Sequence, residues 1–94
     1  MTTTSKLSQA TMYLMDAIKS VRAAEIMLKS EGITLCGVTL NWDGSNDVHV
    51  FTGIDKLAAA AGVETLPGMT PIYEKTGFNL EDVEFFQIVK GVEK

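Results

Sequence analysis

His49 is the only histidine in the chain, so any site that uses an imidazole must contain it. Val48 and Val50 flank it and place it in a predicted strand. A catalytic triad would also need Ser45 or Cys36 nearby with an orienting carboxylate, and no spacing in the sequence brings those groups together. The sequence therefore favours a structural or surface histidine, with ligand contact as the alternative.

Cys36 is the only cysteine, so neither an intramolecular disulfide nor a thiolate metal site of the usual kind can form. Because Leu35 and Gly37 flank it in an apolar run, we expect a buried thiol in a reducing environment. The acidic pair Asp43 and Asp47 is typical of a turn. We therefore predict no metal site, no cofactor and no enzymatic activity.

The start of a short predicted helix is a candidate binding site for a small anionic ligand. Thr52 and Gly53 precede this helix and Lys56 lies in its first turn, where backbone N–H groups and the helix dipole favour negative charge. Trp42 and His49 are the candidate stacking or hydrogen-bonding groups. The alternative is that Thr52 and Asp55 only cap the helix, in the arrangement called a capping box.

Composition limits the chain to one folded domain, residues 1–94, since 94 residues with 46% hydrophobic residues suit a single core. The net charge of −4 opposes non-specific binding to nucleic acid. The N-terminus is polar, and charges interrupt the following segment before it reaches membrane length. We expect no signal peptide, no membrane span and a cytoplasmic protein.

One long helix is predicted from about Ser5 to Ser30, because the segment lacks Gly and Pro and is rich in helix formers. Ser5 or Ser8 is the expected N-cap, and Gly32 the expected stop. The helix carries large apolar residues every seven positions, each of the first three followed three positions later by alanine. This seam consists of Leu7, Ala10, Leu14, Ala17, Val21, Ala24 and Leu28.

Heptad spacing places the seam on one side of the helix, and its alanines permit close approach of an opposing backbone. A second apolar set, Met12, Tyr13, Met15, Ile18 and Ile26, widens the apolar surface beyond one contact. We therefore predict that the seam is a homo-oligomer interface, a dimer or higher. The alternative is that the whole seam packs on the protein's own sheet.

The remaining segments are predicted to form two hairpins, one before and one after the short helix. Residues 33–42 and 47–52 flank the turn 43–46, and a central pair Gly44 and Ser45 would place Val38 opposite Phe51. Gly62 is expected to end the short helix, and Val63–Pro71 to form a loop. Strands are predicted at 72–78 and 83–89, with helix as the rival for 80–90.

The expected fold is therefore α+β in the order α-β-β-α-β-β. The long helix is expected to cross one face of a mostly antiparallel four-stranded sheet.

The segments Val48–Ala58 and Val83–Ile88 resemble small uncharacterised proteins of phages and prophages. The resemblance implies an accessory protein that works by binding, located in the cytosol of the host cell. Such proteins include inhibitors of host defence, which bind proteins or sequester signalling nucleotides.

The sequence leads to three functional hypotheses. The first is a non-enzymatic, oligomeric protein that binds a small anionic ligand. The phage resemblance implies an anti-defence role for it, with a signalling nucleotide as the candidate ligand. The second is a protein-directed inhibitor or structural accessory protein whose partner is a host protein. The third is a hydrolase or isomerase that uses His49.

Overall fold

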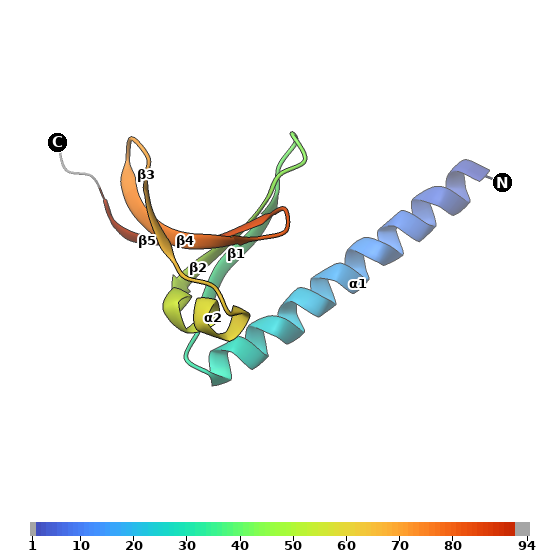
Figure 1. The fold of residues 1–94 in the computed structure, drawn as a ribbon. Coiled ribbons are helices and arrows are strands. Elements are labelled where there is room, and N and C mark those ends of the chain that lie inside the picture. The colour runs from blue at the N-terminus through green and yellow to red at the C-terminus, as the bar shows by residue number, and fades with distance from the viewer. Residues whose placement is uncertain (1, 92–94) are drawn as a thin grey trace.

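The computed structural model describes residues 2–91, with side chains from Lys6 onward (Figure 1). It contains a long N-terminal helix, a short second helix and a sheet, which confirms the α+β class. In chain order the elements are α1 (Thr2–Ser30), β1 (Thr34–Leu40), β2 (Asn46–Thr52), α2 (Ile54–Ala61), β3 (Leu66–Met69), β4 (Tyr73–Leu80) and β5 (Val83–Gly91).

The sheet has five strands in the order β1-β2-β5-β4-β3. Strands β2 and β5 are parallel, and the other neighbours are antiparallel. The prediction of four strands was therefore wrong, because β3 lies within the segment that we expected to be a loop. Pro67 is compatible with β3, since β3 is an edge strand whose outer side needs no ladder hydrogen bond.

Strand β5 confirms strand rather than helix for residues 83–89. It pairs with β2 on one side and with β4 on the other. The Phe85 ring stacks on that of Phe78, with centroids 5.0 Å apart and planes 7° apart. Glu81 in the β4–β5 turn has a φ of 54°, a left-handed conformation that is unfavourable for glutamate.

The hairpin β1–β2 has a different register from the one predicted. Val38 pairs with Val48 rather than with Phe51, and Leu40 with Asn46, so the connecting loop spans residues 41–45. The Asp43 carboxylate accepts hydrogen bonds from the backbone N–H and the hydroxyl of Ser45 at 3.0 and 2.7 Å. These bonds stabilise the longer loop. They also lower the pKa of Asp43, and the backbone bond has the larger effect.

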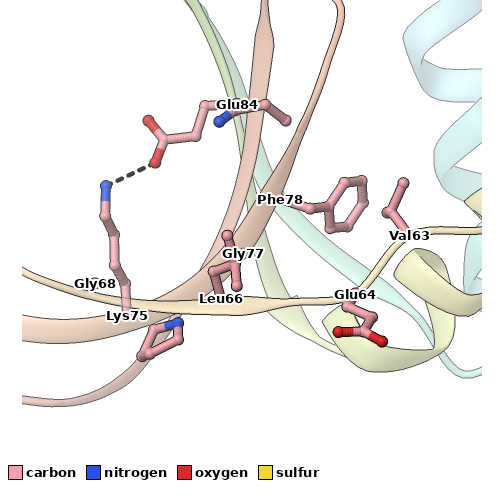
Figure 2. Close-up of a pocket in the computed structure, with 10 residues that line it drawn as sticks. Val63, Glu64, Leu66, Gly68, Lys75, Gly77, Phe78 and Glu84 are labelled. Atoms are coloured by element: carbon pink, nitrogen blue, oxygen red, sulfur yellow. Dashed lines mark hydrogen bonds and ion pairs between the residues drawn. The ribbon is translucent and has the colours of Figure 1, made fainter.

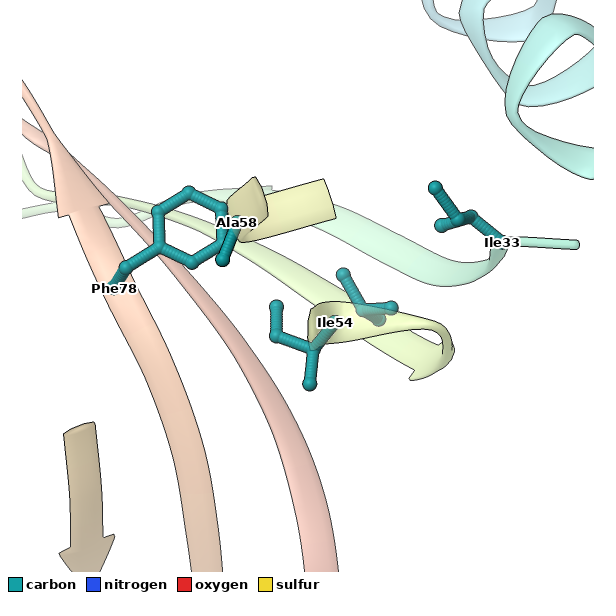
Figure 3. Close-up of a cluster of buried hydrophobic side chains, with 5 residues drawn as sticks. Ile33, Ile54, Ala58 and Phe78 are labelled. Atoms are coloured by element: carbon teal, nitrogen blue, oxygen red, sulfur yellow. The ribbon is translucent and has the colours of Figure 1, made fainter. Parts of the chain in front are cut away.

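The hydrophobic core is small and lies between α2 and the sheet (Figure 3). Gly53 precedes α2 with a φ of 94°, and a Cβ there would lie 2.8 Å from Cγ1 of Ile33. Glycine is therefore required for the close approach of the two segments. Among the side chains that the structure describes, the buried hydrophobic residues are Ile33, Val50, Ile54, Ala58 and Phe78.

Helix α1 extends away from the sheet rather than across it (Figure 1). It begins at Thr2, before both predicted caps, and ends at Ser30. Gly32 supplies the predicted stop with a φ of 84°, and the Ile33 N–H donates to the Leu28 carbonyl at 2.9 Å. Near this end, Leu28 packs against the core. The expected packing of the whole helix across one sheet face was wrong, because the core lies beside only the last turns of α1.

Candidate functional site

The middle of the predicted seam faces an open groove between α1 and β1. The groove has a volume of about 460 Å³, and its walls are mainly apolar. The wall on α1 contains Leu14, Ala17 and Val21 of the seam, with Ile18, Arg22 and Glu25 beside them. The wall on β1 consists of Leu35, Cys36, Gly37, Val38 and Leu40. The helix therefore presents its seam toward its own sheet without closing on it.

Large seam side chains remain exposed along most of α1. Leu14 is 60% exposed and Val21 39%, and Leu40 on the opposite wall is 75% exposed. The second apolar set is also exposed, because Met12, Met15 and Ile26 each exceed half of their full accessibility. Apolar side chains on more than one side of α1 are therefore left uncovered by the rest of the chain.

The accessible surface of the chain is larger than a compact protein of its mass would have. It amounts to 7189 Å², whereas the scaling law for folded monomers gives about 5,300 Å² at 10.2 kDa. The radius of gyration is 16.1 Å, against about 12.4 Å for a compact domain of this length. The surplus of about 1,900 Å² is comparable with the area that one subunit buries in an obligate dimer.

Cys36 is exposed and lines this groove, so the prediction of a buried thiol was wrong. The reason is a β-bulge. Leu35 pairs with Val50 and Gly37 with His49, which leaves Cys36 as an extra residue in β1. The bulge also places Leu35 and Val38 on one face although they are an odd number of residues apart.

The predicted ligand-binding residues lie in separate places. Trp42 is 99% exposed in the β1–β2 loop, whereas Thr52 and Gly53 lie at the opposite end of β2. The seven residues of β2 span about 20 Å. Trp42 and the start of α2 therefore do not form one pocket.

At the start of α2, polar groups are already hydrogen-bonded within the protein. The Ile54 N–H donates to Oε1 of Gln87 at 3.0 Å. Lys56 Nζ donates to the carbonyl of Glu31 at 2.5 Å. Gly53 is the N-cap residue and makes no side-chain cap, so the predicted capping box of Thr52 and Asp55 was wrong. Asp55 instead accepts a hydrogen bond from the Thr65 hydroxyl at 3.3 Å.

His49 lies on the sheet face opposite the buried Val50, because neighbouring residues in a strand alternate between faces. Its ring stacks on Phe86, with centroids 4.7 Å apart and planes 9° apart. Lys75 Nζ lies 5.3 Å from the centroid of the same Phe86 ring. The imidazole is thus part of an aromatic stack.

A second hollow, of about 410 Å³, lies between β3, β4 and the end of α2 (Figure 2). The Lys75 ammonium and the Glu84 carboxylate form an ion pair in it, with Nζ and Oε2 2.7 Å apart. The hydrogen bond to Glu84 raises the pKa of Lys75, and burial opposes this shift. Since the two charges satisfy each other, we assign no ligand to this hollow.

Within the part of the chain that the structure describes, His, Cys, Asp and Glu side chains form no group of three or more that could hold a metal ion. No helix in that part is long and apolar enough to cross a bilayer.

Comparison with known proteins adds no assignment. The chain matches no family model, and no curated protein and no solved structure is significantly similar to it.

The sequence reasoning missed the β1 wall of the groove. The sequence placed Leu35, Val38 and Leu40 in one predicted strand, but it did not show that they share a face. The bulge at Cys36 puts them on the same side of β1, and this bulge has no signature in the sequence.

Proposed function

We propose that the protein is a non-enzymatic binding protein that acts as a homo-oligomer, with α1 as its assembly element. The observation that carries the proposal is the exposed apolar seam of α1 facing an unfilled apolar groove. Contiguous apolar surface of this extent is typical of interaction sites.

The stability of α1 gives independent support. The helix has 29 residues, and only its last turns lie against the core. In proteins, most helical stability comes from packing of an apolar face against other elements. A contact along the middle of α1 would supply that packing.

The small anionic ligand expected from the sequence has weaker support. The first N–H of α2 is bound to Gln87, and Lys56 is bound to Glu31. Those bonds would compete with an anion at this helix start. Capture of a host protein by the same apolar surface is the alternative, and an anti-defence role stays a prediction of the phage resemblance.

The test is the molar mass in solution, measured by light scattering coupled to size-exclusion chromatography. We expect a mass of at least twice 10.2 kDa for the wild type. Ala17→Glu puts a charge into the groove, so it should reduce the mass to that of one chain. Ala23→Glu, the same change at an exposed position outside the groove, is the matched control and should keep the wild-type mass.

A wild-type protein that is a single chain at all concentrations would refute the proposal. So would an Ala17→Glu variant that folds, as circular dichroism can show, and keeps the wild-type mass.

A further inference from the structure

We propose that the groove between α1 and β1 is the docking site for α1 of a second copy, and that the two α1 helices run antiparallel. This proposal rests on the proposed function and specifies its geometry. Each copy would insert its helix into the groove of the other, so the contact is isologous and closes as a dimer.

The seam itself favours the antiparallel orientation. In an antiparallel pair, each large residue of the heptad faces a small one of the partner helix, so Leu and Val fit against Ala in every layer. Among the registers that achieve this, two give the longest overlap of the seams. One places Ala10 opposite the partner's Val21, and the other places Ala10 opposite the partner's Leu28. A parallel pair would instead stack alanine on alanine and leave gaps between the leucine layers.

Charge also favours a second copy as the occupant. Helix α1 has four basic and two acidic side chains, a formal charge of +2, whereas residues 31–94 have four basic and ten acidic ones, a charge of −6. A basic helix seated against the acidic domain of another copy is attracted to it. The same helix would gain no such attraction from a partner with a basic surface.

The area is sufficient for a stable dimer. If each chain buries the surplus of about 1,900 Å², the pair buries about 3,800 Å², which is within the range of obligate homodimers. The β1 wall adds Leu35, Val38 and Leu40 to the contact, so each inserted helix would pack on a helix and on a sheet.

Crosslinking tests the orientation. In a Cys36→Ser background, Ala10→Cys is mixed with Val21→Cys or with Leu28→Cys, and one variant of each mixture carries an affinity tag. We expect a mixed dimer from one of the two mixtures after treatment with a short bismaleimide. Ala10→Cys alone should not crosslink, because its two thiols are at least about 16 Å apart along the antiparallel helices.

Cys36 provides a second readout in the native chain, since it is exposed in a single chain and lines the groove. Its reaction with a maleimide should be at least about tenfold slower in the wild-type assembly than in the Ala17→Glu variant, because the inserted helix covers the thiol.

Three outcomes overturn the proposed geometry while leaving the oligomer intact. The first is a self-crosslink of Ala10→Cys, which indicates parallel helices. The second is an assembled protein in which neither mixture crosslinks. The third is a Cys36 that reacts equally fast in the wild-type assembly and in the Ala17→Glu variant. A wild-type protein that stays monomeric refutes the proposed function as well.

Discussion

The ammonium group of Lys56 donates a hydrogen bond to the backbone carbonyl of Glu31, which joins the first turn of α2 to the segment that ends α1. A lysine that the sequence suggested as an anion ligand therefore fixes the junction between the two helices. The bond lies beside Gly32, where the chain turns from α1 toward β1. The bond therefore lies at the point where α1 leaves the domain.

Lys56→Met should lower the free energy of unfolding by about 1 kcal/mol, because it removes a charged donor from that carbonyl but keeps the apolar stem. Urea denaturation measures the change. Lys90→Met, at an exposed position in β5, is the matched control and should have little effect. Equal effects of the two substitutions would contradict a structural role for Lys56.

Gly77→Ala should destabilise the protein by at least about 3 kcal/mol or prevent folding. A Cβ at Gly77 would lie 2.1 Å from the carbonyl oxygen of Phe85, which belongs to the paired backbone of β5 and cannot move aside. At Gly91 a Cβ would have only an ordinary contact, 3.9 Å from the Ile72 oxygen. Gly91→Ala should therefore be nearly neutral, and similar losses in both variants would show that the β4–β5 pairing is not as described.

Glu81→Asn should raise the free energy of unfolding by about 0.5 to 1 kcal/mol, because asparagine tolerates the left-handed φ of 54° better than glutamate does. Thermal and urea denaturation both measure this gain. Asp82→Asn, in the same turn but without a positive φ, controls for the loss of one negative charge. A gain of the same size in Asp82→Asn would assign the effect to charge instead of backbone strain.

The ion pair of Lys75 and Glu84 predicts a pH dependence at the alkaline end. Its hydrogen bond raises the pKa of Lys75 above the ordinary value of 10.5, so its stabilisation is present at neutral pH and is lost as the pH rises through that raised pKa. Since the pair is partly exposed, Glu84→Gln should cost only about 0.5 kcal/mol near neutrality.

The difference between wild type and Glu84→Gln, measured by urea denaturation, should shrink as the pH rises past 10.5. A difference that stays constant over this range would show that the pair does not stabilise the protein through its charge.

Local signals predicted much of the fold. Gly32 and Gly62 end their helices with a positive φ, as their positions after apolar helical runs indicated. The β-branched and aromatic residues of Val83–Val89 form a strand as expected. These features depend only on residues that are close in the sequence, so they can be predicted from one sequence.

Features that depend on tertiary contacts were not predictable. Strand β3 contains Pro67 and is stabilised only by pairing with β4. The bulge at Cys36 changes which residues of β1 share a face. The departure of α1 from the sheet follows from the place of the core, since α2 already covers the buried part of the sheet around Val50. None of these has a local sequence signature.

The sequence predicted the α1 side of the candidate site but not the β1 side. The heptad spacing of Leu14, Ala17 and Val21 predicted an apolar seam, and those residues line the groove. The spacing did not show that the seam faces β1 of the same chain across an open gap. The predicted ligand residues Trp42 and Gly53 are separated because they lie at opposite ends of one strand.

Hydrogen–deuterium exchange of α1 tests the central claim most directly, since it reports whether another copy covers the helix. We expect the amides between Leu7 and Ala24 to be protected at high protein concentration, and to lose most of that protection on dilution and in Ala17→Glu. Exchange at the rate of an unstructured peptide at every concentration would contradict the account, because it would mean that nothing packs on the seam.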